Sequence, residues 1–211
     1  MKILLIFTIL YGTLPFIFYQ IIKKNLTGLK EIYPFILTVL IASLYEFLGT
    51  IILKISFEKW YLIYKILAFL SLHYFFYYLL NKAYKFIFLL FCGVFGLLVV
   101  LTFSLWIDFN FLDLNSYFNI FQTIVVLTFS ILWFRKMFRS LEVDNLLKNS
   151  NFYFISGLII YYCGTVYLFL MSSTIYNIDK SNFQYYWLLN IILNLVLRSL
   201  LIIGIWKARV K

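Results

Sequence analysis

Seven long apolar segments fill this chain, and each is long enough to cross a lipid bilayer. A membrane-spanning helix needs about 20 mostly apolar residues to cross a hydrocarbon core that is ~30 Å thick. The approximate bounds of the segments are 3–22, 34–53, 60–80, 86–106, 116–134, 152–172 and 185–206. A β-barrel would need apolar and polar residues in alternation, whereas a stretch such as Phe86 to Val100 is apolar throughout. The sequence therefore predicts an all-α integral membrane bundle of seven helices, forming a single domain over residues 1–211.

The composition agrees with a membrane protein and argues against a soluble or nucleic-acid-binding one. The chain is 64% hydrophobic and 12% charged, whereas soluble domains average about 45–50% apolar and about 25% charged residues. Most of the residues behind the net charge of +10 lie in loops, where Lys and Arg orient a membrane protein and meet anionic lipid headgroups. The expected partner of these charges is the lipid bilayer, with no role for nucleic acid.

The first apolar segment resembles a signal peptide in that Lys2 precedes it. Residues 12–16 nevertheless make a poor cleavage site, so we expect this segment to be retained as a span. Abundant Ile, Lys, Phe, Tyr and Asn suit an AT-rich genome. The expected location is a bacterial inner (plasma) membrane.

Basic residues are distributed unequally between the two sets of loops. If the amino terminus lies outside, 12 of the 18 Lys and Arg residues fall on the cytoplasmic side and four on the outer side. The positive-inside rule therefore predicts an N-out, C-in threading. Trp60, Trp106 and Trp187 then fall near the outer boundary, where aromatic side chains with a polar group are enriched.

The longest predicted cytoplasmic segment runs from Arg135 to Asn151 and mixes apolar with charged residues. One interpretation is that the fifth helix continues past the membrane and lies at its surface. The other is that Arg135, Lys136 and Arg139 form a docking surface for a cytoplasmic signalling partner.

Four ionisable side chains fall inside the predicted spans, namely Glu46, Lys65, His73 and Arg198. Such residues cost free energy in a bilayer, so we first interpret them as functional residues. Glu46 and Lys65 lie on consecutive antiparallel segments, ~10 Å and ~8 Å below the outer boundary at ~1.5 Å per residue. An ion pair between them is expected, unless Lys65 extends outward to the interface.

Other polar residues fall at the same depth. Asn190, Asn194 and Arg198 form one stripe on the last helix, since they are spaced at intervals of four. The sequence therefore predicts a polar cavity in the outer half of the bundle. Its main expected ligand-binding or ion-pathway residues are Glu46, Lys65, Gln122, Asn190 and Asn194, and its secondary ones are His73, Arg198, Asn119, Ser43 and Thr165.

Two further interpretations of these residues stay open. Amides inside a membrane often join helices through hydrogen bonds worth ~0.6 kcal/mol each, which would make Asn190 and Asn194 structural. His73 and Arg198 lie deeper, so they could share a second polar layer with Tyr77 and Asn81.

No pattern in the chain predicts catalysis, a cofactor or a metal site. There is one histidine, and Cys92 and Cys163 both fall within spans. An enzyme would need an acid–base pair, a nucleophile with its base, or a metal-ligand cluster. A retinal protein would need a lysine in the middle of the last helix, which has none before Lys207.

The favoured hypothesis is a receptor or sensor-input module that binds a small ligand or ion in the outer polar cavity and signals to a cytoplasmic partner. The alternatives are a small-solute or ion transporter or channel, a homo-oligomeric membrane pore, and a structural membrane subunit. Pro15 and Pro34 are the only prolines, and the expected lack of broken helices speaks against a transporter.

Overall fold

The computed structural model describes residues 2–22, 29–55, 57–80, 84–104, 111–140, 146–178 and 182–209. Asn81, Trp106 and residues 141–145 of the predicted docking segment lie outside these ranges. The described residues are helical and include no strand. The elements are α1 (Lys2–Tyr11), α2 (Leu14–Ile22), α3 (Tyr33–Leu44), the π-helix η2 (Tyr45–Ile52), α4 (Phe57–Leu80), α5 (Lys85–Ser104), α6 (Phe111–Ser140), the 3₁₀-helix η4 (Leu146–Lys148), α7 (Ser150–Leu170), α8 (Ser172–Ile178) and α9 (Phe183–Ala208).

Six helices in the described part of the chain are long and apolar enough to cross a membrane. Their bounds are Tyr33–Ile52, Trp60–Leu80, Lys85–Thr102, Leu114–Arg139, Ser150–Leu170 and Tyr185–Ala208. Each has at least 18 residues, which gives a length of at least about 27 Å. The structure thus agrees with an all-α membrane bundle whose long helices correspond to the last six predicted segments.

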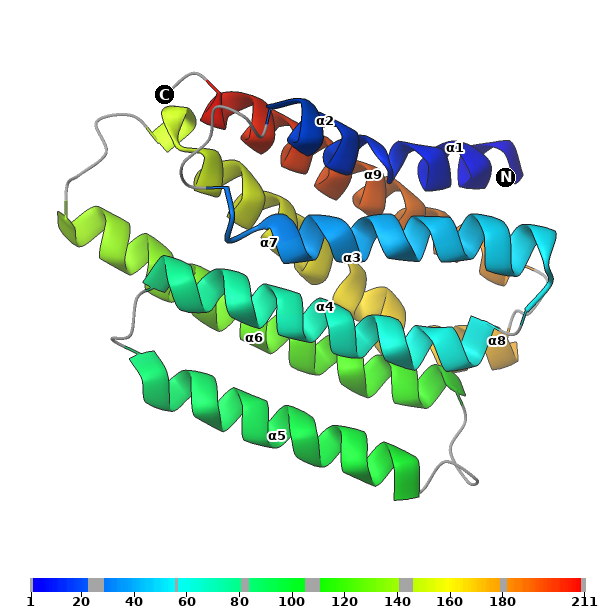
Figure 1. Ribbon diagram of the computed structural model, residues 1–211. Coiled ribbons are helices and arrows are strands. Elements are labelled where there is room, and N and C mark those ends of the chain that lie inside the picture. Colours follow the sequence, from blue (N-terminus) through cyan, green and yellow to red (C-terminus); the bar gives the residue numbers. More distant parts are fainter. Residues whose placement is uncertain are drawn as a thin grey trace.

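The first predicted segment is broken, and neither of its halves is long enough to span a bilayer alone. A turn at Gly12–Thr13 separates α1 from α2, and the two lie end to end beside α9 (Figure 1). Pro15 explains the break, since it has no N–H for the Tyr11 carbonyl and its ring would clash with that carbonyl in a continuous helix. In the first turn of α2 the same proline is well tolerated.

The second predicted segment is continuous but changes its winding. After Leu44 the chain passes from α3 into the π-helix η2, where the Leu53 amide donates to the Leu48 carbonyl at 2.9 Å. Helices of this type are rare and occur frequently at functional sites. Glu46 lies in the first turn of η2, so the winding changes at the residue that the sequence singled out.

The packing is uneven across the bundle. The most extensive contacts join α7 to α9 and α6 to α7, whereas α5 lies apart along one side (Figure 1). Stacked rings connect α5 to its neighbours. The ring centroids of Phe95 and Phe69 of α4 lie 3.8 Å apart, and those of Phe88 and Phe129 of α6 lie 4.1 Å apart. The remaining surface of α5 is apolar and exposed, as expected for a helix that contacts lipid.

Large apolar side chains fill the half of the bundle that contains the C-terminal half of α4 and the N-terminal half of α7. Phe75, Phe76, Phe154, Leu158 and Leu201 are at most 1% exposed there. This close packing leaves the polar side chains of the spans to gather in the opposite half.

Two glycines provide a matched test of this packing. A Cβ on Gly204 of α9 would overlap the Phe154 ring, whereas a Cβ on Gly93 of α5 would meet nothing within 4 Å. We expect Gly204→Ala to lower the free energy of unfolding by about 1–2 kcal/mol, because the overpacked ring must move. Gly93→Ala should be neutral or stabilising by up to ~1 kcal/mol. Unfolding in detergent micelles measures both, and equal effects would contradict this packing.

Candidate functional site

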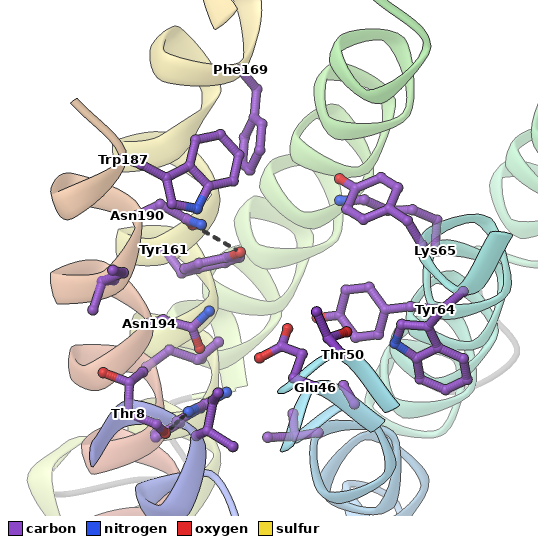
Figure 2. Close-up of a pocket in the computed structure, with 18 of the residues that line it drawn as sticks. Thr8, Glu46, Thr50, Tyr64, Lys65, Tyr161, Phe169, Trp187, Asn190 and Asn194 are labelled. Atoms are coloured by element: carbon purple, nitrogen blue, oxygen red, sulfur yellow. Dashed lines mark hydrogen bonds between the residues drawn. The ribbon is translucent and has the colours of Figure 1, made fainter. Parts of the chain in front are cut away.

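A cavity of about 240 Å³ lies between α1, α3, η2, the N-terminal half of α4, the C-terminal half of α7 and the N-terminal half of α9 (Figure 2). At ~30 Å³ per molecule this volume corresponds to about eight waters, far more than a packing defect. Its polar lining consists of Thr8, Glu46, Thr50, Lys65, Asn190, Asn194 and Arg198. Its aromatic lining consists of Phe35, Trp60, Tyr61, Tyr64, Tyr161, Tyr162, Phe169 and Trp187.

Five residues that the sequence placed at the expected site line this one cavity. They are Glu46, Lys65, Asn190, Asn194 and Arg198. They come from η2, α4 and α9, so segments that are far apart in the sequence meet around the same space. The other expected site residues do not line the cavity.

Arg198 ties α9 to the broken first segment. Its side chain is 5% exposed, and Nη1 donates to the Thr8 carbonyl of α1 while Nη2 donates to Ser43 Oγ at 3.4 Å. Nε has no hydrogen-bond partner in the described part of the chain. Arg198 is thus held at the edge of the cavity by neutral oxygens.

Gly12 allows this close approach. A Cβ there would overlap Ser43 Oγ and lie 2.8 Å from Arg198 Cζ. The turn between α1 and α2 therefore needs glycine because of the guanidinium and hydroxyl packed against it.

The Glu46 carboxylate points into the cavity toward the side that carries Asn194 (Figure 2). It makes no hydrogen bond or ion pair with any residue that the structure describes, although the charge of Arg198 acts on it. The expected Glu46–Lys65 ion pair is therefore absent. Lys65 instead donates a hydrogen bond to Asn119 of α6.

Lys65 is 3% exposed and lies among aromatic rings. Its Nζ donates to Asn119 Oδ1 and lies 4.9 Å from the ring centre of Tyr61, 5.5 Å from that of Phe169 and 5.9 Å from that of Tyr64. Cations are attracted to ring faces at such distances. An ammonium group has three N–H donors, and two of those on Lys65 have no acceptor among the described residues.

Side-chain amides of α6 form hydrogen bonds around Lys65. Asn119 Nδ2 donates to the Tyr61 hydroxyl at 3.1 Å, and Gln122 Nε2 donates to the Lys65 backbone carbonyl at 3.0 Å. The Tyr162 hydroxyl in turn donates to Gln122 Oε1 at 3.3 Å. Asn119 and Gln122 thus join α4, α6 and α7, and neither lines the cavity.

The two asparagines of α9 differ in their bonding. Asn190 Oδ1 accepts a hydrogen bond of 3.4 Å from the Tyr161 hydroxyl, whereas the Asn194 amide has no partner in the described residues. Thr165 donates to the Tyr161 carbonyl of its own helix at 2.7 Å. The Asn194 amide and the Nδ2 group of Asn190 are therefore available to a molecule in the cavity.

His73 belongs to a different cluster. Its ring packs against Phe69, Phe88 and Phe129, and Nε2 lies 3.4 Å from Cys92 Sγ. Arg198 does not share a polar layer with His73, one of the interpretations left open by the sequence, because it bonds to Thr8 and Ser43. In the described part of the chain, no group of three or more His, Cys, Asp and Glu residues could hold a metal ion.

The basic residues predicted as a docking surface lie in the last turns of α6, which extends to Ser140. Arg135 and Arg139 are exposed, and Lys136 Nζ donates to the Leu79 carbonyl near the end of α4 at 3.2 Å. At ~1.5 Å per residue, Arg135 lies ~24 Å along α6 from Asn119, so one helix connects the Lys65 support to the basic surface.

The sequence did not predict two features of the site, the π-helical winding and the aromatic side chains around Lys65. The break at Gly12–Thr13 has a signal in the sequence, because Pro15 favours a kink in the first segment. The position of Tyr61 was also predictable, since Tyr61 precedes Lys65 by four residues and lies on the same helical face.

Comparison with protein-family models, curated proteins and solved structures found no match.

Proposed function

We propose that this protein is a membrane receptor or sensor-input module that binds a small ligand in the cavity and signals to a cytoplasmic partner. The observation that carries the proposal is a cavity lined by one acidic and two basic side chains, none of which forms an ion pair with another described residue. Buried charges in a membrane are costly unless paired. Hydrogen bonding between helices does not require charged side chains, whereas a bound ligand would supply the partners that these charges lack.

The proposed threading has seven spans, with α1 and α2 together serving as the first. The N and C termini then lie on opposite sides, in agreement with their places at opposite ends of the bundle (Figure 1). The distribution of basic residues favours N-out and C-in in a bacterial inner membrane. The cavity would face the outer half, and Arg135, Lys136 and Arg139 the cytoplasm.

Signalling requires two states that differ in their affinity for the ligand. The break at Gly12–Thr13 and the π-helix η2 are the irregular parts of the cavity wall, and irregular turns can change backbone angles at low cost. The apolar half of the bundle, which holds Phe76 and Phe154 at 0% exposure, separates the cavity from the cytoplasmic end. This separation favours a receptor over an open path.

A cavity-filling variant tests ligand binding. Ala42 is 8% exposed and lines the cavity, so Ala42→Phe should occupy the space, whereas Val94→Phe on the exposed face of α5 should not. Mass spectrometry of small molecules that co-purify from native membranes should find a compound with the wild type and Val94→Phe that is lost with Ala42→Phe. Identical compound profiles in all three would contradict the proposal.

The same variants test the coupling to the cytoplasmic side. A photo-crosslinking residue at position 139 should capture a cytoplasmic protein, and Ala42→Phe should change the yield at least about threefold if the two sites share a two-state equilibrium. A yield that does not depend on the cavity would contradict a receptor.

The second candidate is a transporter or channel, and the helix break favours it. The expectation of unbroken helices was wrong, and transporter sites often use interrupted helices. Flux of small ions into liposomes, compared between the wild type and Glu46→Gln, separates the two candidates. A flux that depends on Glu46 would favour the transporter, and no flux would favour the receptor.

A further inference from the structure

The chemistry of the cavity wall restricts what the ligand can be, if the proposed ligand-binding function holds. Two basic side chains, Lys65 and Arg198, face the space together with a single acid, Glu46, among the described lining residues. Arg198 is always charged in proteins, and its charge acts on Glu46. Two positive charges and one negative charge leave the described lining with one excess positive charge.

Several hydrogen-bond donors of the lining lack acceptors, beside the Glu46 carboxylate and the Thr50 hydroxyl, which also bond to no described residue. Lys65, 3% exposed, has two N–H groups without an acceptor, and the Nε of Arg198, 5% exposed, has none among the described residues. The Asn194 amide adds further donors that bond to no described residue. Buried donors without acceptors cost free energy, so a molecule rich in acceptor oxygens would stabilise this wall.

We propose that the ligand is a small organic monoanion: a carboxylate that accepts from the Lys65 ammonium group, attached to an apolar or aromatic body. A carboxylate offers only acceptors and carries the one charge that the wall lacks. Phe169 and Tyr61 line the cavity beside Lys65, and Trp187 packs edge-on against Phe169; such rings favour an apolar or aromatic body. At 240 Å³, the space accommodates on the order of ten non-hydrogen atoms at the packing density of protein interiors.

The test uses four probes of nearly the same shape and different charge. They are 3-phenylpropionate, its neutral amide, 3-phenylpropylamine and the zwitterion phenylalanine. Binding to the full chain in phosphatidylcholine nanodiscs is measured by titration of tryptophan fluorescence, since Trp60 and Trp187 line the cavity. The acid should bind at least about tenfold more tightly than the amide, and the amine least well.

Two variants test whether Lys65 causes the preference for the acid. Lys65→Met keeps the length of the side chain and removes the charge, so it should weaken binding of the acid at least about thirtyfold and leave the amide unchanged. Lys85→Met is the control, because Lys85 is exposed at the start of α5.

Three results would overturn the inference: equal binding of acid and amide, preference for the amine or the zwitterion, or no binding of any probe. These results are separable from a failure of the proposed function. If a compound co-purifies with the wild type but not with Ala42→Phe and that compound is a base, the ligand-binding function stands and the monoanion is wrong.

Discussion

Replacement of Arg198 by methionine is expected to lower the free energy of unfolding by about 3 kcal/mol, because removal of a buried charge leaves its neighbours uncompensated. The variant removes the donor to the Thr8 carbonyl and to Ser43, and it takes away the cation whose charge acts on Glu46. The tether between α9 and the broken first segment is lost at the same time. Unfolding of the purified protein in detergent micelles measures the effect.

A double-mutant cycle separates the electrostatic part from the tether. Glu46→Gln removes the charge that Arg198→Met leaves uncompensated, so the double variant should be more stable than the sum of the two single effects predicts by about 1 kcal/mol or more. Arg198→Lys should not restore full stability, because lysine lacks the planar fork that reaches Thr8 and Ser43 together. Strict additivity would contradict a charge interaction between Glu46 and Arg198.

Substitution of Gly12 by alanine should lower the free energy of unfolding by about 2–3 kcal/mol, near the upper end for overpacking. The added Cβ would overlap Ser43 Oγ and approach the guanidinium of Arg198. The effect should exceed that of an alanine in an open helical position, because the atoms to be displaced are those that hold the helix break in place. Thermal unfolding in micelles measures it.

Ser43→Ala provides the matching control for Gly12→Ala. It removes the hydroxyl that the new Cβ would overlap and keeps the rest of α3 unchanged. The double variant should recover part of the lost stability, with the remainder due to contact with Arg198. If Ser43→Ala gives no recovery, the turn at Gly12 does not pack against α3 as described.

Depth along the helices was predictable from the sequence, and side-chain direction was not. A fixed rise of ~1.5 Å per residue placed Glu46, Lys65, Asn190 and Asn194 at a common level, and all four line the cavity. The Glu46–Lys65 ion pair is not formed, although both residues line the cavity. Lys65 instead bonds to Asn119, a partner from a helix that the sequence could not place beside it.

The six long helices were also predictable from the sequence, whereas the contacts at the break in the first segment were not. Hydropathy identified all six candidate spans, since each is a continuous apolar stretch. The break in the first segment depends on Pro15 together with the space that Gly12 leaves for Arg198, a contact between residues 186 positions apart. Such a contact is set by the packing of α1 and α2 along α9, which a single sequence does not reveal.

The most direct test of the proposed ligand-binding cavity is a crystal structure, in a lipid phase, of the protein purified from native membranes. We expect density for a small molecule in the cavity, in contact with Lys65 Nζ, with the Glu46 carboxylate still separate from Lys65. A collapsed cavity in which Glu46 and Lys65 form a direct ion pair would contradict it, because the charged groups would then satisfy one another and need no ligand.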